Sequence, residues 1–261
     1  MMYYRRTGSG PAVVLLHGFP DSGEAWTGVA SALEREFTVI IPDLPGSGRS
    51  ALHGTPTLTD MAVGVKEILD HEGIERAVIA GHSMGGYTAM AFAAQFPAML
   101  AGISMVHSAP WADDDEKKAS RQKVIDLILK GGKETFIKQM TANLYAPSFA
   151  AAHPDVVQRK AASGMEMTDE GMINFYRAMI ARADTTHLLK DAPFPIQWVL
   201  GEADGIIDLK KILKECHVSG INFVSLYKDT GHMSMAERPD MLMADLLTFC
   251  RYCYSHNPSA V

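Results

Sequence analysis

One serine of the chain lies in a glycine-flanked pattern that suits a nucleophile. Ser83 is the centre of a G-x-S-x-G pattern, Gly81 to Gly85. The pattern directly follows the apolar run Ala77 to Ala80 and directly precedes a helix-like segment, Tyr87 to Gln95. Between a strand and a helix, such glycines permit a tight turn that exposes the serine hydroxyl. The bare pattern is weak by itself, and its alternative interpretation is a glycine-rich turn without chemistry.

A serine hydroxyl is a poor nucleophile at neutral pH, so it needs a base and a third group that orients the base. His232 lies in a D-T-G-H-M segment that follows the apolar run 221–226, and Asp204 follows the run 196–200 in the same way. Because sites of open α/β sheets form at the carboxyl ends of the strands, both side chains could reach Ser83. The sequence therefore predicts Ser83 as nucleophile, His232 as base and Asp204 as orienting carboxylate.

Two further motifs extend this pattern along the chain. His17-Gly18-Phe19-Pro20 follows the first continuous apolar run, and residues 43–50 read D-L-P-G-S-G-R-S. With the chain order serine, aspartate, histidine, these segments resemble the α/β-hydrolase family, which has an H-G-x-P loop and a D-x-x-G-x-G-x-S turn. The resemblance spans nearly the whole chain outside residues 111–191, and it implies an α/β-hydrolase fold and a serine hydrolase activity.

The resemblance also implies roles for single residues. The backbone N–H groups of Phe19 and Met84 would form the oxyanion hole, where preset donors stabilise the charge of the tetrahedral state. Asp204 has rivals in Asp208 and Glu202, and the family position favours Asp204. Without its context and chain order, His232 would be read as one structural histidine among ten.

Two residues are candidates for contact with a substrate. His107 lies just past the apolar run that ends at Val106, and Trp111 lies where a helical segment begins. In the expected fold both would line a pocket, and ordinary packing is the equal alternative. The methionines and aromatic residues of the same segment suit either a pocket for apolar substrates or, with greater weight, a hydrophobic core.

The elements that must position these residues follow from the apolar pattern. Continuous apolar runs that alternate with helix-like segments are typical of a parallel sheet with helices on both faces. No such run occurs from 111 to 191, where the apolar spacing is helical and Thr168 with two following acidic residues is typical of a helix start. We expect an α/β, mostly parallel, doubly wound sheet from residues 1–110 and 192–261, with residues 111–191 as an inserted helical cap. The runs that we expect to form strands are Ala12 to Leu16, Phe37 to Ile41, Ala77 to Ala80, Gly102 to Val106, Ile196 to Leu200 and Ile221 to Leu226.

Composition excludes several classes of function. The formal net charge of -6 disfavours nucleic acid as a partner, because such binding needs clustered Lys and Arg. The N-terminus lacks an apolar leader, no run is long enough to span a membrane, and three cysteines fit a reducing compartment, so we expect a cytoplasmic protein. Motifs for metal ligation and nucleotide loops are missing, so we expect neither a metal nor another cofactor. The sequence leaves open whether the chain forms a homo-oligomer.

The prediction that follows is a serine hydrolase with a small-molecule substrate. Small to medium apolar carboxylic esters would be cleaved through an acyl-enzyme on Ser83. The same three residues would also serve perhydrolysis or the hydrolysis of a carbon–carbon bond, a lactone or an amide, and the motifs do not separate these activities. A ligand-binding receptor on a hydrolase scaffold is the alternative from another class.

Overall fold

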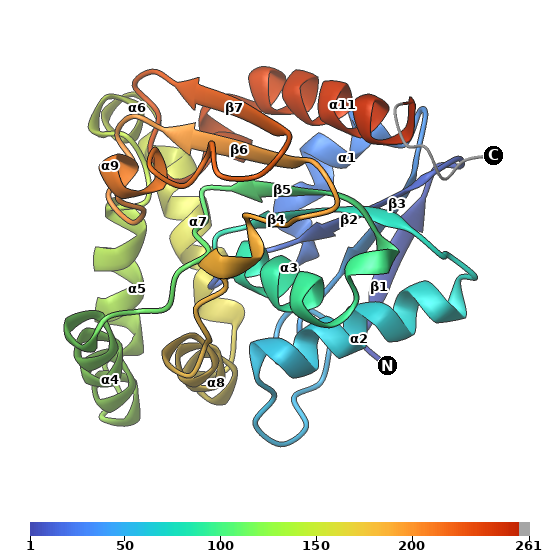
Figure 1. Cartoon of the computed structure of the whole chain (residues 1–261). Coiled ribbons are helices and arrows are strands. Elements are labelled where there is room, and N and C mark those ends of the chain that lie inside the picture. The colour runs from blue at the N-terminus through green and yellow to red at the C-terminus, as the bar shows by residue number, and fades with distance from the viewer. Residues whose placement is uncertain (256–261) are drawn as a thin grey trace.

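The computed structural model describes residues 1–255, and the strands within this range form one sheet (Figure 1). The strands are β1 (Tyr4–Thr7), β2 (Ala12–Leu16), β3 (Thr38–Pro42), β4 (Ala77–His82), β5 (Leu100–Val106), β6 (Ile196–Gly201) and β7 (Asn222–Tyr227). They lie in the order β1-β3-β2-β4-β5-β6-β7. Every neighbouring pair is parallel except β1 with β3.

The sheet confirms the predicted α/β class and its mostly parallel order. Each of the six continuous apolar runs corresponds to a strand, and β2 to β6 are buried along their whole length. The sequence reading missed β1, which pairs antiparallel with β3 at the edge of the sheet. Its sequence, Tyr-Arg-Arg-Thr, is polar and half-buried, because an edge strand needs no apolar residues on both faces.

Helices cover both faces of this sheet (Figure 1). On one face, α1 (Thr27–Leu33) packs against α11 (Pro239–Ser255), and on the other, α2 (Leu58–His71) packs against α3 (Met84–Gln95). Alternate side chains of each strand enter the two cores. Leu15 of β2 belongs to the cluster of α1 and α11, whereas Leu16 belongs to the cluster of α2 and α3.

The chain between β5 and β6 is helical, as its apolar spacing predicts. Its helices gather beyond the carboxyl ends of the parallel strands (Figure 1). They are α4 (Asp115–Leu129), α5 (Lys133–Ala142), α6 (Pro147–Ala152), α7 (Pro154–Glu166) and α8 (Asp169–Ile180). The Thr168 side chain caps α8 by accepting a hydrogen bond from Gly171 N. The division into a core of 1–110 and 192–261 and a cap of 111–191 stays a prediction, and its last six residues lie outside the described range.

The remaining helices are short. They are α9 (Leu209–Ile212), α10 (Ser234–Glu237) and the 3-10 helices Gly23–Trp26, Pro97–Met99 and Thr186–Leu188. Within the described residues, no helix combines the length and apolar composition that crossing a membrane requires.

Candidate active site

Ser83 lies in the tight turn between β4 and α3. Its backbone has φ 51° and ψ −116°, a strained conformation that residues with side chains rarely adopt. A Cβ atom at Gly81 would lie against the backbone of Gly85, and a Cβ at Gly85 would lie against the backbone of Leu16. The two glycines therefore allow the close approach of strand, turn and helix that holds Ser83 at the first turn of α3.

Ser83 and His232 line one cavity, here called the Ser83 cavity, which has a volume of about 130 Å³. Most of its wall comes from the helices inserted between β5 and β6. His232 itself is only 2% exposed, on the loop after β7. The structure thus brings the predicted nucleophile and base to one small space. The other lining residues are Phe19, Tyr87, Lys117, Ser120, Arg121, Val124, Met140, Leu144, Tyr176, Met179 and Ile206.

The His232 ring is oriented by Asp204. The imidazole Nδ1 lies 2.8 Å from Asp204 Oδ2, and because an ionised carboxylate only accepts, Nδ1 carries the proton. The lone pair of Nε2 is then free to act as a base. Burial would raise the pKa of the Asp204 carboxyl, but the charge of His232 and hydrogen bonds from His107 and His232 outweigh it and hold this pKa well below its usual range.

The rival carboxylates have other partners in the structure. Asp208 is exposed and accepts hydrogen bonds from the backbone N–H groups of Lys210 and Lys211 at the start of α9. Glu202 is exposed and accepts from Asp229 N at 3.1 Å. Among the described residues, Asp204 is the carboxylate that contacts the His232 ring.

His107, a predicted substrate-binding residue, lies behind Asp204 and is fully buried. Its Nδ1 lies 3.0 Å from Asp204 Oδ2, so it donates to the oxygen that also accepts from His232. It is absent from the lining of the Ser83 cavity within the described chain. Burial lowers the pKa of His107, although the hydrogen bond to Asp204 opposes this, and the ring is therefore held neutral.

Trp111, the other predicted substrate-binding residue, lines an adjoining cavity together with Lys117 and Arg121. Lys211 Nζ lies 4.2 Å from the centroid of a Trp111 ring. Contact between Trp111 and a substrate stays a prediction.

A buried carboxylate that the sequence reading missed holds the His232 loop. The Glu237 carboxylate accepts hydrogen bonds from the backbone N–H groups of Gly231, Met233 and Ala146 at 2.9 to 3.1 Å. His232 N donates to Leu144 O at 2.7 Å, which ties the loop to the segment between α5 and α6. A glutamate five residues after the G-H pair is the only signal in the sequence, and it does not reveal which N–H groups this side chain meets.

The predicted oxyanion donors flank Ser83. Met84 is the first residue of α3, where helix N–H groups have no partner within the helix. Phe19 follows β2, in a loop fixed by His17, whose Nε2 accepts from Leu44 N at 2.9 Å. Within residues 1–255, neither Phe19 N nor Met84 N donates to a protein group. Both N–H groups are therefore available to a ligand, and their role as oxyanion donors stays a prediction.

Three side chains near the cavity have the donor types that a metal ion could use. One donor atom each of His107, Asp204 and His232 lies within 4.8 Å of the others. Hydrogen bonds account for this closeness, because both imidazole Nδ1 atoms donate to the same carboxylate oxygen. A metal on these atoms would replace the interaction that orients His232. The absence of a metal ion at this site stays a prediction.

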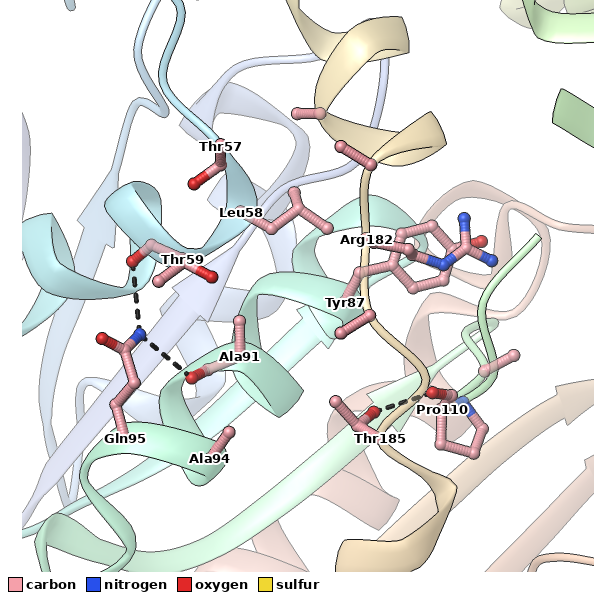
Figure 2. A pocket seen from close by; sticks show the side chains of 14 residues that line it. Thr57, Leu58, Thr59, Tyr87, Ala91, Ala94, Gln95, Pro110, Arg182 and Thr185 are labelled. Carbon is pink, nitrogen blue, oxygen red and sulfur yellow. Dashed lines mark hydrogen bonds between the residues drawn. The ribbon is translucent and has the colours of Figure 1, made fainter.

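Tyr87 and thirteen other residues line a second cavity of about 210 Å³ (Figure 2). Small residues such as Ala91 and Ala94 form much of its wall. Tyr87 lines both this cavity and the Ser83 cavity. The guanidinium carbon of Arg182 lies 3.9 Å from the centre of the Tyr87 ring, and this contact fixes the ring between the two cavities.

Comparisons with known proteins support the family and the fold. A model of the alpha/beta hydrolase fold family matches residues 11–239. A solved structure of a thermophilic esterase from Thermogutta terrifontis superposes with a TM-score of 0.93 at 28% identity, covering 97% of this chain and 94% of that one. A pimeloyl-[acyl-carrier protein] methyl ester esterase of Sodalis glossinidius is 25% identical over 248 residues, 91% of this chain and 93% of that protein. A Mycobacterium bovis protein is 42% identical over 104 residues, which cover 40% of this chain and only 30% of that protein.

Proposed function

Because this chain belongs to the alpha/beta hydrolase fold family, we propose that it hydrolyses small carboxylic esters through an acyl-enzyme on Ser83. His232 takes the proton of the Ser83 hydroxyl as the oxygen attacks the ester carbonyl, and then delivers this proton to the leaving alcohol. The same imidazole next activates a water molecule, which cleaves the acyl-enzyme and releases the acid. Asp204 keeps the proton of His232 on Nδ1 and stabilises the imidazolium that forms during each step.

One observation carries this proposal. Ser83 is strained into a turn that opens on the same cavity as His232, while His232 is oriented from behind by a buried carboxylate. A packing role would require neither a strained serine nor a histidine with a free Nε2 in one cavity. The N–H groups of Phe19 and Met84 are suited to stabilise the oxyanion of the tetrahedral intermediate.

The size of the cavity supports a small substrate. A cavity of roughly 150 Å³ holds a group the size of benzene. The Ser83 cavity, at about 130 Å³, therefore suits a short acyl or alcohol group. The esterases named among the relatives support an ester as substrate.

Replacement of the nucleophile tests the proposal. Ser83→Ala should lower kcat for a p-nitrophenyl ester by roughly four orders of magnitude or more, because the covalent step is lost. A fluorophosphonate should label the unchanged protein and leave Ser83→Ala unlabelled. Ser31→Ala, at an exposed serine of α1, is the matched control and should keep full activity.

Two results would contradict the proposal. Undiminished hydrolysis by Ser83→Ala would end the assignment of the nucleophile. Absent turnover across a panel of esters, lactones and amides, combined with tight and saturable binding of one of them, would favour a receptor instead.

A further inference from the structure

The described side chains that line the Ser83 cavity carry positive charge and no balancing negative charge. Lys117 and Arg121, both on α4, line the cavity. Among the described residues, its lining includes no aspartate or glutamate. A ligand beside Ser83 therefore meets two cationic side chains and no facing carboxylate, and such a wall attracts an anion.

The charge of Arg121 is only partly balanced by its protein partner. Arg121 Nε lies 2.5 Å from Asp113 Oδ2, and Arg182 Nη2 lies 3.0 Å from Asp113 Oδ1. The side chains of Arg121, Arg182 and Asp113 are 11%, 6% and 4% exposed. Two guanidinium groups thus share one carboxylate, and one positive charge remains in a region largely shielded from water.

The guanidinium of Arg121 also keeps free donors. Nη1 contacts the sulfur of Met179 at 3.1 Å, which is a weak acceptor. Within residues 1–255, Nη2 has no hydrogen-bond acceptor in the protein. A shielded guanidinium with unused N–H groups gains from a carboxylate, because charge-assisted hydrogen bonds satisfy its donors and its charge together.

The rest of the wall limits what can lie between this charge and Ser83. Apart from Lys117 and Arg121, the residues that face the cavity are mostly apolar or aromatic, among them Val124, Met140 and Tyr176. The ligand that fits such a wall has an anionic end, a short apolar middle and a reactive carbonyl at Ser83.

We propose that the substrate is an ester or lactone that carries a free carboxylate, bound by the Arg121 guanidinium with Lys117 at the rim. The inference rests on the proposed function, since it assumes hydrolysis at Ser83. It changes the expected substrate from an apolar ester to the half ester of a short dicarboxylic acid, or a compound of equivalent charge and length.

A pair of matched substrates tests the inference. Monoethyl succinate carries the carboxylate, and ethyl succinamate replaces it with a neutral amide of nearly the same shape. Hydrolysis of both is followed by titration of the released acid. We expect the unchanged protein to have a kcat/KM about 10- to 100-fold higher for monoethyl succinate, the range that hydrogen bonds to charged groups supply.

Three variants distinguish an effect of the charges of Arg121 and Lys117 on substrate preference from an effect on folding. Arg121→Gln should lose most of the preference for monoethyl succinate, measured as the ratio of its kcat/KM for monoethyl succinate to its kcat/KM for ethyl succinamate. Lys117→Gln, at an exposed position, should lose part of the preference and does not put a buried ion pair at risk. Lys123→Gln, an exposed lysine of α4 outside the cavity lining, should retain the full preference.

The outcomes distinguish the inference from the function on which it rests. Equal kcat/KM for the two esters, or equal losses for both in Arg121→Gln and Lys117→Gln, would overturn the carboxylate site and leave hydrolysis at Ser83 intact. Absence of any hydrolysis that depends on Ser83, for either ester, would overturn the proposed function and the inference with it.

Discussion

At the residue scale, the carboxylate of Asp204 collects four hydrogen bonds. Its Oδ2 accepts from the ring Nδ1 atoms of His107 and His232, and its Oδ1 accepts from the backbone N–H groups of Ile206 and Ile207 at 2.8 and 3.1 Å. The two backbone bonds fix the position of the carboxylate, and His107 fixes its direction. His232 therefore meets an acceptor that is already in place before a substrate binds.

Loss of this charge should be severe for turnover. Asp204→Asn should lower kcat by roughly 10³- to 10⁴-fold, because the amide no longer favours the Nδ1–H form of His232 or stabilises the imidazolium. The matched control is Asp208→Asn, which should keep kcat within about twofold because asparagine also caps a helix start. Steady-state kinetics on an ester substrate measure both.

A kcat of Asp204→Asn near that of the unchanged protein would contradict the orienting role. A large loss in Asp208→Asn would instead revive the rival carboxylate that the sequence left open.

The sequence motifs were sufficient to predict the contact of Asp204 with His232, because each residue follows a strand that ends at the same edge of the sheet. They were insufficient for His107. It also follows a strand, and the sequence placed it in the pocket, but its ring is turned to Asp204 through a backbone with φ 48°. The backbone conformation of a single residue cannot be predicted from the spacing of apolar residues.

At the scale of elements, α10 and the loop before it act as one unit around the Glu237 carboxylate. This side chain is 4% exposed and satisfies three backbone N–H groups, two in the His232 loop and one at Ala146. Such groups are costly to leave unpaired when buried. The loop that carries His232 therefore depends on a carboxylate that does not itself line the cavity within the described chain.

Removal of this carboxylate should weaken both folding and turnover. Glu237→Ala should lower the free energy of unfolding by about 3 kcal/mol or more, because three buried N–H groups lose their acceptor. The kcat should fall as well, since the position of His232 is no longer fixed. Urea unfolding and ester kinetics measure the two effects, and Glu75→Ala, at an exposed loop position, is the control.

An unfolding free energy for Glu237→Ala within about 0.5 kcal/mol of the unchanged protein would show that the loop is held by other contacts.

The elements themselves were predictable to different degrees. Strands buried on both faces are mostly apolar, so the runs of β2 to β6 are readable directly from the sequence. Their few buried polar residues have partners, as Ser104 of β5 has in Gln197 of β6. The edge strand β1 has no such constraint and carries two arginines, so no run marks it. Likewise, the position of Arg121 in the wall of the Ser83 cavity depends on how α4 packs against α5 and α8, which helical spacing alone does not determine.

At the scale of the whole molecule, three described histidines besides His232 are buried near the carboxyl ends of the strands. His17, His82 and His107 are at most 1% exposed. Burial lowers the pKa of His17 and of His107, and it holds the pKa of His82 well below the usual value. The folded chain therefore keeps these imidazoles neutral at pH values where the unfolded chain protonates them.

This difference predicts acid sensitivity in a defined range. In the unfolded chain the three imidazoles titrate near pH 6.5, so the contribution of each to stability is fully present above about pH 6.5. Below that pH the unfolded state binds more protons, and each histidine lowers the free energy of unfolding by about 1.4 kcal/mol per pH unit until its folded pKa is reached. Urea unfolding at pH 8, 7, 6 and 5.5 measures the slope.

Carboxylates such as Asp204 have a lowered pKa in the folded chain, so their contribution to the free energy of unfolding is lost only below about pH 4. They therefore do not affect the slope that the histidines cause between pH 7 and 5.5. His53→Gln, at an exposed ring, should leave the slope unchanged. A free energy of unfolding that stays constant or rises between pH 7 and 5.5 would show that the buried rings do not govern acid stability.

The hydrogen bonds that join the His232 loop to residues 144–146 bear on how a substrate reaches Ser83. His232 N donates to Leu144 O and Ala146 N donates to the Glu237 carboxylate, so an outward movement of the segment between α5 and α6 would carry His232 away from Ser83. The proposed reaction therefore requires this segment to stay in place. Of the residues that line the Ser83 cavity, Lys117 and Ser120 of α4 are the exposed ones, so an anion that approaches along α4 meets a lysine before it meets the serine.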